Sequence, residues 1–273
     1  MPKIAMPSIS MALAPWTESL RVAAENNFDA FEVIVAYPSA DLDTITKDVI
    51  KNAREISERN GMEICVHAPF FELNIAAFSK GIREESVRYI KRSIDFCADI
   101  GGKIIVVHTG KYTYPYPPGM TKENNSLKKK QWDYNIESLK NINEYAENKG
   151  VTVCLENIGI DTVDETFEQL LEIRRAVGPS LKFTLDIGHA RLYSDGGVEK
   201  GIKLLGDNIH HIHFTDNDGE KDDHLPIGDG NSDYSNFIDF IKNFQHIVTL
   251  EVVDIGQNPE PILRSREYFN RLV

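Results

Sequence analysis

The chain has 273 residues, of which 41% are hydrophobic, and it carries a formal net charge of −12 at pH 7. A chain of this length can bury a large core, and since α/β barrels of this length often fold as one unit, we expect a single domain over residues 1–273. No apolar run approaches the roughly 20 residues that a transmembrane helix needs, and the acidic balance argues against a nucleic-acid partner, because such binding relies on Lys and Arg neutralising phosphates.

The amino-terminal segment and the cysteines bear on the cellular compartment. The apolar start resembles a short secretory signal, but Pro7 and two serines interrupt it. Three cysteines cannot form a closed set of disulfide bonds. Cys65 and Cys154 lie in apolar strand patterns, and Cys97 lies on a predicted helix. We therefore expect buried free thiols in a cytoplasmic protein.

Short apolar runs alternate with longer amphipathic runs along the chain. The predicted strands are Lys3 to Ile9, Phe31 to Val35, Glu63 to His67, Lys103 to His108, Thr152 to Glu156, Lys182 to Asp186, Ile209 to Phe214 and Ile247 to Val252. The predicted helices are Thr17 to Asn26, Asp43 to Asn60, Lys80 to Ile100, Gln131 to Lys149, Val163 to Val177, Val198 to Leu205, Tyr234 to Asn243 and Pro259 to Leu272. Four helical patterns are followed by a glycine, where a left-handed residue commonly ends a helix: Gly61, Gly101, Gly150 and Gly178.

Eight strand-helix units predict a closed (β/α)₈ TIM barrel, with a doubly wound sheet as the alternative. The polar residues favour the barrel, because its strands all end around one mouth, whereas a doubly wound sheet would spread strand-end side chains along a crevice. Six strands end in metal-ligand side chains: His67, His108, Glu156, Asp186, His213 and Glu251. In the strand around Ile212, alternation places His211 and His213 inside the barrel and Ile212 outside.

Two long loops border the expected mouth. Thr109 to Lys130 contains Tyr112, Tyr114 and Tyr116 among prolines, and a loop of this length is usually functional or disordered, so we interpret it as a candidate lid over a small ligand. The lysines at 128–130 are interpreted as opening the solvated face of the next helix, with a phosphate contact as the alternative.

The second loop, Thr215 to Asp233, carries Asp222 and His224, which have ligand chemistry. Its proline and glycines supply turns that would hold it over the mouth. Asp216 is interpreted as a residue that shapes this loop.

With His189, three residues after Asp186, these positions give nine candidate ligands: His67, His108, Glu156, Asp186, His189, His213, Asp222, His224 and Glu251. Imidazole and carboxylate suit Zn²⁺, Mn²⁺, Fe²⁺ or Co²⁺, and the set contains no thiolate, which argues against a closed structural zinc site. Nine ligands suffice for two or three ions with bridging carboxylates. A smaller set would hold one ion and leave positions open for substrate oxygens: Glu156, Asp186, His213 and Glu251. For any single residue a hydrogen-bonded structural role is the alternative, and three histidines are interpreted in that way: His210, His211 and His246.

The candidate ligands lie in a series of short motifs: His67-Ala68-Pro69, Val107-His108-Thr109-Gly110, Leu155-Glu156-Asn157, Asp186-Ile187-Gly188-His189-Ala190, His211-Ile212-His213, Asp222-Asp223-His224 with Gly228-Asp229-Gly230, and Leu250-Glu251. In this number and order they resemble the motifs of the xylose isomerase-like TIM-barrel superfamily, from the third strand to the eighth. That superfamily contains sugar isomerases and epimerases and also endonuclease IV.

The endonuclease IV branch implies that all nine positions bind three zinc ions, which cleave DNA at abasic sites. The chain departs from that branch in its first strand, Ile4 to Ser8, where a Gly-Ala-His pattern is usual, and in Thr109-Gly110, where Pro-Gly-Ser is usual. Asn157 also leads into Ile158-Gly159-Ile160-Asp161 rather than a Thr-Ala-Gly-Gln-Gly-like stretch. Loops rich in Arg and aromatic residues, which would extrude a nucleotide, are not evident after the first two strands.

The isomerase and epimerase branch implies one divalent ion, Mn²⁺, Co²⁺ or Mg²⁺, on the smaller set of four ligands. Glu156 and Glu251 would remove and return a proton next to a ketose carbonyl, and His189 would bind a substrate oxygen. Asp222 and His224 occupy a loop where some epimerases keep an Arg. We favour this branch, with a small carbohydrate as the substrate and DNA as a partner only under the alternative.

A metal-binding scaffold without catalysis is a third interpretation, because a fold alone does not determine a function. The sequence leaves open which sugar is bound, whether it is phosphorylated, and whether the chain forms a homo-oligomer.

Overall fold

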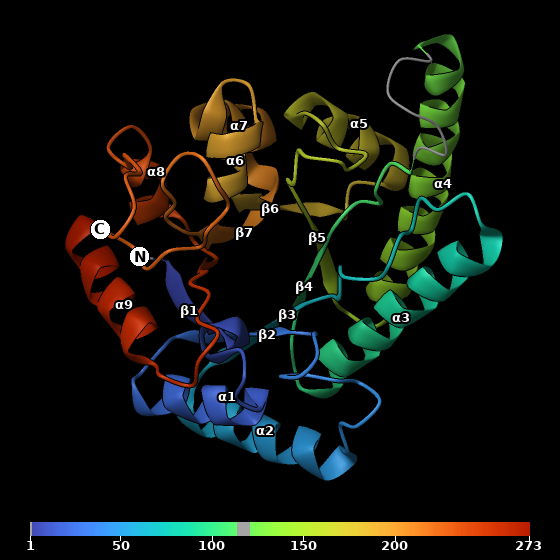
Figure 1. Ribbon diagram of the computed structural model, residues 1–273. Helices are drawn as coiled ribbons and strands as arrows, with labels where there is room; N and C mark the ends of the chain where they lie inside the picture. Colours follow the sequence, from blue (N-terminus) through green and yellow to red (C-terminus); the bar gives the residue numbers. More distant parts are fainter. Residues whose placement is uncertain (1, 114–120) are drawn as a thin grey trace.

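The computed structural model of the chain describes residues 2–113 and 121–273. Its eight strands are all parallel and close into one barrel in sequence order, because β1 (Lys3–Pro7) pairs with β8 (Ile247–Leu250) as well as with β2 (Ala30–Ile34). The helices surround this barrel (Figure 1). The predicted TIM barrel is therefore confirmed, and the closure excludes the doubly wound sheet.

The remaining strands are β3 (Glu63–His67), β4 (Ile104–Val107), β5 (Thr152–Glu156), β6 (Lys182–Asp186) and β7 (Ile209–Phe214). The α-helices are α1 (Trp16–Glu25), α2 (Lys47–Asn60), α3 (Lys80–Asp99), α4 (Thr121–Asn148), α5 (Phe167–Val177), α6 (Ile187–Tyr193), α7 (Gly197–Leu205), α8 (Ile238–Asn243) and α9 (Glu260–Leu272). Two 3₁₀-helices complete the described elements, η1 (Ser8–Met11) and η2 (Gly206–Asn208).

The strands lie where they were predicted, but α2, α5 and α8 begin later than predicted, at Lys47, Phe167 and Ile238, and the largest difference is at α4. Helix α4 begins at Thr121, well before Gln131, so the predicted loop is shorter and the lysines at 128–130 lie within the helix. Two of these lysines pair with carboxylates, Lys128 with Glu165 at 2.7 Å and Lys129 with Asp133 at 2.9 Å. These lysines therefore belong to a solvated helix face, as predicted, but they do not mark the start of the helix.

The four glycines that follow the helices all have positive φ values, as predicted. Gly61, Gly101 and Gly150 have left-handed φ values of 64°, 86° and 67°. Gly178 also has a positive φ, 148°, which side-chain-bearing residues rarely adopt, although its ψ of 163° differs from that of the other three. The Gly178 backbone N–H donates to the Arg174 carbonyl at the helix end, and the Arg174 guanidinium donates to the carbonyl groups of Leu181 and Pro179 beyond it.

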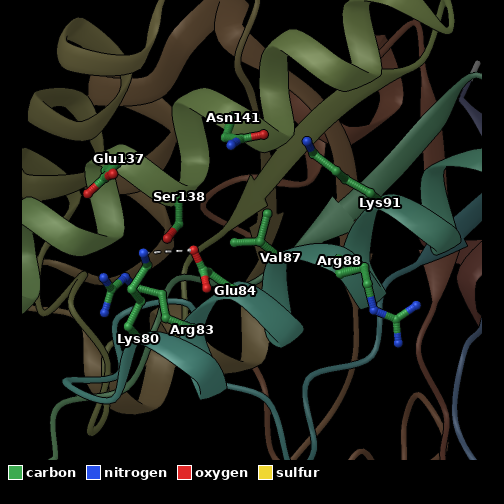
Figure 2. A pocket seen from close by; sticks show the side chains of 9 residues that line it. All are labelled: Lys80, Arg83, Glu84, Val87, Arg88, Lys91, Glu137, Ser138 and Asn141. Carbon is green, nitrogen blue, oxygen red and sulfur yellow. Dashed lines mark ion pairs between the residues drawn. The ribbon is translucent and has the colours of Figure 1, made fainter.

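The outer ring of helices carries a groove between α3 and α4. This groove has a volume of about 390 Å³ and is lined mainly by charged side chains (Figure 2). Lys80 and Glu84 of α3 pair across one turn at 3.6 Å, and Ser138 of α4 donates to the carbonyl of Ile75. Among the residues described, none of the nine candidate ligands lines the groove, so it is separate from the barrel mouth.

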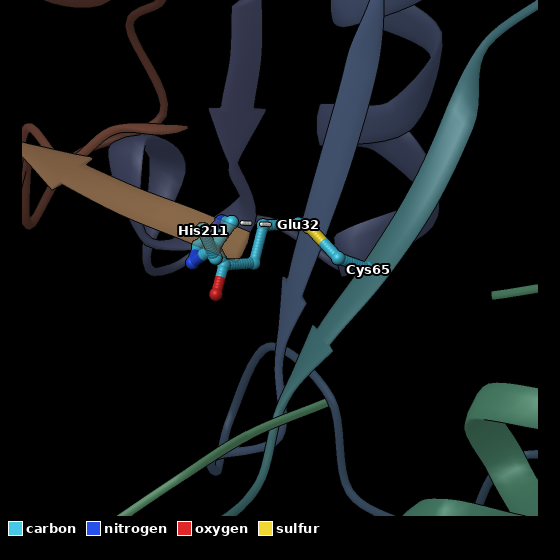
Figure 3. Close-up of side chains that lie close together, drawn as sticks. All are labelled: Glu32, Cys65 and His211. Atoms are coloured by element: carbon cyan, nitrogen blue, oxygen red, sulfur yellow. Dashed lines mark hydrogen bonds and ion pairs between the residues drawn. The ribbon is translucent and has the colours of Figure 1, made fainter. Parts of the chain in front are cut away.

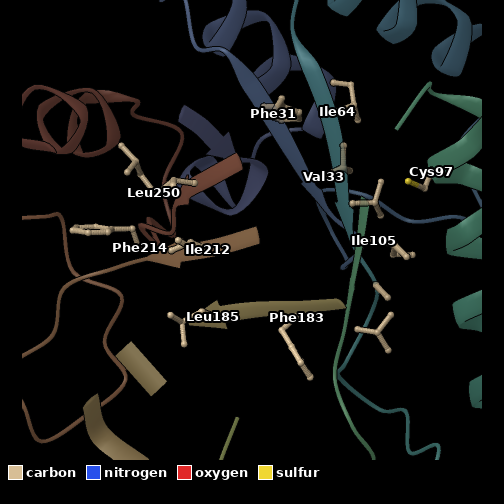
Figure 4. Packing of buried hydrophobic residues seen from close by; sticks show 14 of the residues in the cluster. Phe31, Val33, Ile64, Cys97, Ile105, Phe183, Leu185, Ile212, Phe214 and Leu250 are labelled. Carbon is tan, nitrogen blue, oxygen red and sulfur yellow. The ribbon is translucent and has the colours of Figure 1, made fainter. Parts of the chain in front are cut away.

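The main apolar core lies between the barrel and the helices. Strand residues that point outward fill it, as Figure 4 shows for Phe183 and Leu185 of β6 and for Ile212 and Phe214 of β7. Burying each such side chain contributes roughly 1.5–3 kcal/mol. Because alternate residues of a strand face opposite sides, filling this shell with apolar residues leaves the intervening positions to the barrel interior.

The barrel interior is apolar near the amino ends of the strands and polar above. Ala5, Ala30, Cys65 and Ile247 form a small buried cluster, and Glu32, Cys65 and His211 meet beside it (Figure 3). The three cysteines are free and buried, as predicted, while the cytoplasmic location inferred from them stays a prediction. Within the described ranges, no helix has both the length and the apolarity needed to cross a membrane.

Candidate metal centre

The strand ends bring the candidate ligands together at the mouth of the barrel. Glu156 and Asp186 are the last residues of β5 and β6, and Glu251 follows β8 directly. His213 lies one residue before the end of β7. In a parallel barrel these ends face the same side, which explains why residues far apart in sequence converge.

The central group consists of Glu156, Asp186, His213 and Glu251, which offer one donor atom each within 4.8 Å of one another. The Nδ1 atom of His213 lies 2.9 Å from Glu156 Oε1, 3.2 Å from Glu251 Oε2 and 3.6 Å from Asp186 Oδ2. All four side chains are buried. Three carboxylates around one imidazole form a compact, negatively charged set of N and O donors.

A second group shares Glu156 with the first. The Nε2 atoms of His67 and His108 lie 3.1 Å apart, and they lie 3.2 Å and 2.9 Å from Glu156 Oε2. Phe70 packs against both imidazoles, with ring centroids 5.1 Å from His67 and 4.6 Å from His108. Glu156 thus presents one oxygen to each of the two groups.

A third group comes from two segments after β6 and β7. His189 Nε2 and His224 Nε2 lie 3.0 Å and 3.2 Å from the same Asp222 oxygen, Oδ2. His189 lies on α6, a helix that the sequence did not predict and that begins immediately after β6. Asp186 caps this helix by accepting a hydrogen bond from the His189 backbone N–H at 2.6 Å.

The loop that carries Asp222 and His224 is held by Asp216, as predicted. The Asp216 carboxylate accepts hydrogen bonds from the backbone N–H groups of Gly228, Gly230 and Ser232 at 2.9–3.1 Å. A Cβ atom at Gly230 would lie only 2.3 Å from the Asp216 carboxylate, so a glycine is required there. The loop shape therefore depends on one buried carboxylate and on the absence of a side chain.

The two glutamates of the central group have pKa values that burial and charge move apart. Burial raises the pKa of Glu251 to about 7, although His213 and His224 offset part of this effect. Burial acts in the same direction on Glu156, but the neighbouring His213 and His108 outweigh it and hold the Glu156 pKa well below its usual range. One carboxyl therefore binds a proton far more readily than the other.

The histidines also differ. Burial lowers the pKa of His108 to about 4, despite the opposing effect of Glu156. Burial has the same tendency at His213, but Glu251, Glu156 and Glu32 raise its pKa well above the usual value. For His224, the carboxylates of Glu251 and Asp222 overcome burial and raise the pKa to about 9.

The residues fit a divalent cation, because several buried polar atoms point to a missing positive partner. Within the described part of the chain, Asp186 Oδ2, Asp222 Oδ1, His224 Nδ1 and Glu251 Oε2 are buried and accept or donate no hydrogen bond, although His224 Nδ1 and Glu251 Oε2 lie 3.5 Å apart as an ion pair. Unpaired buried polar atoms are rare in proteins and costly. Carboxylate and imidazole donors are those preferred by Zn²⁺, Mn²⁺, Fe²⁺ and Co²⁺.

The outer nitrogens of two histidines support the same interpretation. His67 Nδ1 lies 2.7 Å from the carbonyl oxygen of Ala68, and His189 Nδ1 lies 3.0 Å from that of Asn157. A carbonyl only accepts, so each Nδ1 carries the hydrogen and a neutral ring has its lone pair on Nε2. Both Nε2 atoms face the ligand groups, which is the arrangement that metal-binding histidines commonly adopt.

A cavity of about 360 Å³ opens above these groups. Its lining contains seven of the nine histidine and carboxylate ligands together with Phe70, Phe71, Ile158, Ile160 and Tyr193. Lys111 is the basic side chain in this lining other than histidine, as far as the described residues extend. Of the predicted tyrosine lid, Tyr114 and Tyr116 lie outside the described residues, so the lid stays a prediction.

Sequence reasoning missed Glu32, which lies inside the barrel with no exposed surface. Glu32 Oε1 is 3.3 Å from His213 Nε2, and Thr249 donates a hydrogen bond of 2.6 Å to Oε2. Burial tends to raise the Glu32 pKa, but His213 and His211 outweigh it and lower the pKa to about 2. The available signal was a single carboxylate within the otherwise apolar strand Ala30–Ile34.

The histidines predicted to be structural lie outside the three groups. His210 and His246 stack on each other, with ring centroids 4.5 Å apart, beside the amino ends of the strands. His211 is buried within the barrel, and its Nε2 lies 2.9 Å from Thr249 Oγ1.

Comparison with known proteins gives a consistent family relationship. The sequence model described as xylose isomerase-like TIM barrel matches residues 20–272. The uncharacterized protein MJ1311 of Methanocaldococcus jannaschii is 33% identical over 259 residues, which are 92% of this chain and 82% of that protein. A solved structure described as a D-tagatose 3-epimerase-like protein superposes with a TM-score of 0.82 at 30% identity, covering 99% of this chain and 96% of the other.

Two further relatives carry names with different activities. Fructoselysine 3-epimerase of Shigella flexneri is 24% identical over 265 residues, 94% of this chain and 92% of that enzyme. A probable endonuclease 4 of Mycobacterium leprae is 23% identical over 255 residues, 89% of this chain and 92% of that protein. The chain is thus similar to both epimerases and nucleases.

Proposed function

The chain belongs to the xylose isomerase-like TIM-barrel family, and from this premise we propose that it is a divalent-metal-dependent sugar isomerase or epimerase. The observation that carries the proposal is the pair Glu156 and Glu251. Glu156 comes from β5 and Glu251 from the end of β8. Both line the same cavity, and both approach His213 Nδ1, at 2.9 Å and 3.2 Å. Two carboxylates on either side of a sugar carbon can remove a proton and return it from the other face.

The residues that would hold the ion are Glu156, Asp186, His213 and Glu251. A divalent cation, when bound, polarises a ketose carbonyl and a neighbouring hydroxyl. It thereby makes the hydrogen on the carbon next to the carbonyl more acidic. The unpaired oxygens Asp186 Oδ2 and Glu251 Oε2 support this assignment. Which ion is bound, Zn²⁺, Mn²⁺, Co²⁺ or Mg²⁺, follows from metal availability as much as from these donors.

The roles of the chain's own residues follow from their positions. Glu156 and Glu251 form the proton-transfer pair. A neutral His189 accepts a hydrogen bond from a substrate hydroxyl through Nε2, since its Nδ1 donates to the Asn157 carbonyl and the residue lines the cavity. Phe70, Phe71 and Ile158 exclude water from the cavity and pack against the apolar face of a sugar ring.

A small carbohydrate is favoured over DNA by the size and charge of the cavity. Its volume of about 360 Å³ is at the small end of ligand pockets. Its lining has one lysine among the described residues but four carboxylates, Glu156, Asp161, Asp222 and Glu251. Binding of a DNA phosphate backbone requires more basic than acidic side chains. The relatives named as 3-epimerases favour inversion at carbon 3 of a ketose among the reactions of this class.

An abasic-site endonuclease is the second candidate, and one observation favours it. The three ligand groups each contain at least three donors within 4.8 Å, so the nine residues are sufficient for three ions. Neighbouring ions can clamp both the attacking and the leaving oxygen of a phosphodiester. Relatives named endonuclease 4 share this family.

Elemental analysis of purified protein, combined with product analysis, tests the proposal. We expect one tightly bound divalent ion per chain and the appearance of a C3 epimer from a ketohexose such as D-fructose or D-tagatose. Three tightly bound ions and incision of an abasic duplex would support the endonuclease instead. Protein that binds no ion and converts neither substrate would favour a scaffold without catalysis.

A further inference from the structure

Below the ligand groups, a chain of buried hydrogen bonds ends on His213. We propose that Glu32 is a positioning residue, which holds the Nε2–H group of His213 so that Nδ1 is presented to a divalent cation; this role rests on the proposed metal centre. We call Glu32, Thr184, His211 and Thr249 the floor layer. We call Glu156, Asp186, His213 and Glu251 the mouth layer.

The position of Glu32 follows from strand β2. Its neighbours Phe31 and Val33 point outward into the apolar shell, so alternation turns Glu32 into the barrel. Glu32 has no exposed surface, and its Oε1 lies 3.3 Å from His213 Nε2. The opposite side of the same imidazole, Nδ1, faces Glu156 and Glu251. The ring is therefore held between the Glu32 carboxylate below and the carboxylates of Glu156 and Glu251 above.

The directions of the hydrogen bonds determine which nitrogen of His213 is free. Thr249 Oγ1 lies 2.6 Å from Glu32 Oε2. A carboxylate only accepts, so Thr249 donates its single hydrogen to Glu32. For the same reason, the hydrogen between His213 and Glu32 belongs to Nε2 of His213. A neutral His213 then has its lone pair on Nδ1, the atom that faces the mouth layer.

The rest of the floor layer agrees with this assignment. Because Thr249 has given its hydrogen to Glu32, its oxygen accepts from His211 Nε2 at 2.9 Å. His211 Nδ1 lies 3.3 Å from the Thr184 hydroxyl, which donates to it. One arrangement of hydrogens therefore satisfies all four residues from Thr184 to Glu32, and it ends by fixing the tautomer of His213.

A metal site within the floor is the competing interpretation, because Glu32, Cys65 and His211 offer donor atoms within 4.8 Å of one another (Figure 3). These atoms already have partners: both Glu32 oxygens and both His211 nitrogens are engaged, and the Cys65 thiol lies 3.8 Å from the carbonyl of Phe31. In the described residues, Asp186 and Glu251 of the mouth layer each have an unpaired buried oxygen, whereas no side-chain atom of the floor layer is unpaired. The polar atoms of the floor layer therefore satisfy one another without a cation, and we place the cation at the mouth layer.

Cobalt titration tests the role of Glu32 with a readout that does not depend on turnover. Co²⁺ is added to metal-free wild-type protein and to Glu32→Gln, and affinity and the visible absorption of the bound ion are recorded. A glutamine has an accepting oxygen at only one of the two positions occupied by the Glu32 oxygens and an NH₂ donor at the other, so we expect roughly 10–100-fold weaker binding and shifted absorption bands. Asp29→Asn makes the same chemical change at a carboxylate that accepts from Ile4 N–H near the amino end of β1, and it should bind as wild type does.

A second pair of variants keeps the test decisive if Glu32→Gln does not fold. Thr249→Val removes the hydroxyl that orients Glu32, and we expect a smaller loss of cobalt affinity that Thr249→Ser restores. If Glu32→Gln folds, unchanged cobalt affinity and absorption in that variant would overturn the role of Glu32. If it does not fold, unchanged cobalt affinity and absorption in Thr249→Val would do so. Either result would leave the proposed metal centre standing. Wild-type protein that binds no cobalt would overturn the proposed metal centre and this role with it.

Discussion

The mouth layer and the floor layer share strands β6 and β7 and the end of β8, where their residues lie one pleat apart, while β2 contributes only to the floor and β5 only to the mouth. Strand β6 contributes Thr184 to the floor and Asp186 to the mouth, and β7 contributes His211 and His213 in the same way. The floor has one carboxylate, and hydroxyl and imidazole hydrogens satisfy it. The mouth has three carboxylates around one imidazole, and oxygens remain unpaired. What distinguishes a ligand site from a structural network here is the excess of acceptors over donors, rather than polarity or burial.

Removing a carboxylate from the proton-transfer pair should have the largest effect. We expect Glu156→Gln and Glu251→Gln to fold and to lose turnover by about 10²–10⁴-fold, because general acid–base catalysis typically contributes that much. His224→Ala should cost less, since it removes a residue outside the central group. Initial rates on a ketohexose measure the loss. Solvent exchange of the substrate hydrogen retained in both Gln variants would rule out the pair.

Removing the cation should destabilise the mouth layer and leave the floor intact. An ion present at about 100 times its dissociation constant stabilises the fold by about 2.7 kcal/mol, so excess chelator should lower the melting temperature by roughly 5–10 °C. The carboxylates of the mouth layer repel one another without the ion. A melting temperature that chelator does not change would contradict a filled metal centre.

Most of the site residues that the sequence predicted are located at strand ends, and the others, His189, Asp222 and His224, lie on segments that follow those ends. Apolar runs that terminate in His67, Glu156 or Asp186 mark both the end of a strand and a residue at the mouth. Glu32 was missed because it lies inside a strand, where only the alternation of buried faces reveals that it points inward.

Two helical segments were missed for other reasons. Helix α6 begins directly at the end of β6, so Asp186 serves as strand end and helix cap at once, and no loop separates the two elements. The first turns of α4 are polar and lack an apolar period. Ion pairs between residues four positions apart, such as Lys129 with Asp133, stabilise a helix there without an apolar stripe.

The two layers should respond to pH in opposite directions in metal-free protein. Burial raises the Glu251 pKa from 4.5 to about 7, so its contribution to stability is present below pH 4.5 and is lost as pH rises through 7. The histidines overcome burial at Glu32 and lower its pKa to about 2, so its contribution is present above pH 4.5 and is lost as pH falls through 2.

Denaturant unfolding of metal-free wild type, Glu251→Gln and Glu32→Gln between pH 3 and pH 8 separates these contributions. Relative to Glu251→Gln, wild type should lose on the order of 2 kcal/mol between about pH 5 and pH 8. Relative to Glu32→Gln, it should lose stability only toward the acid end. Parallel curves for all three proteins would contradict the difference between the layers.

The far end of the floor layer should show the smallest effect. Thr184→Val removes the donor to His211 Nδ1 and leaves a buried nitrogen unsatisfied, which costs about 1 kcal/mol of folding stability. Cobalt affinity should stay within about twofold of wild type, because the bond between Glu32 and Thr249 fixes the His213 tautomer without Thr184. A loss of affinity as large as that in Glu32→Gln would show that the floor acts as one unit.

Deuterium incorporation into a ketohexose tests the central claim most directly. Metal-loaded wild type is incubated in D₂O with D-fructose or D-tagatose, and the sugar is analysed by NMR and mass spectrometry. We expect deuterium at the carbon next to the carbonyl, together with formation of the epimer. Chelation of the metal should abolish both deuterium incorporation and epimer formation. Incision of an abasic-site duplex that depends on His67 and His108, with no deuterium in any ketose tested, would contradict it.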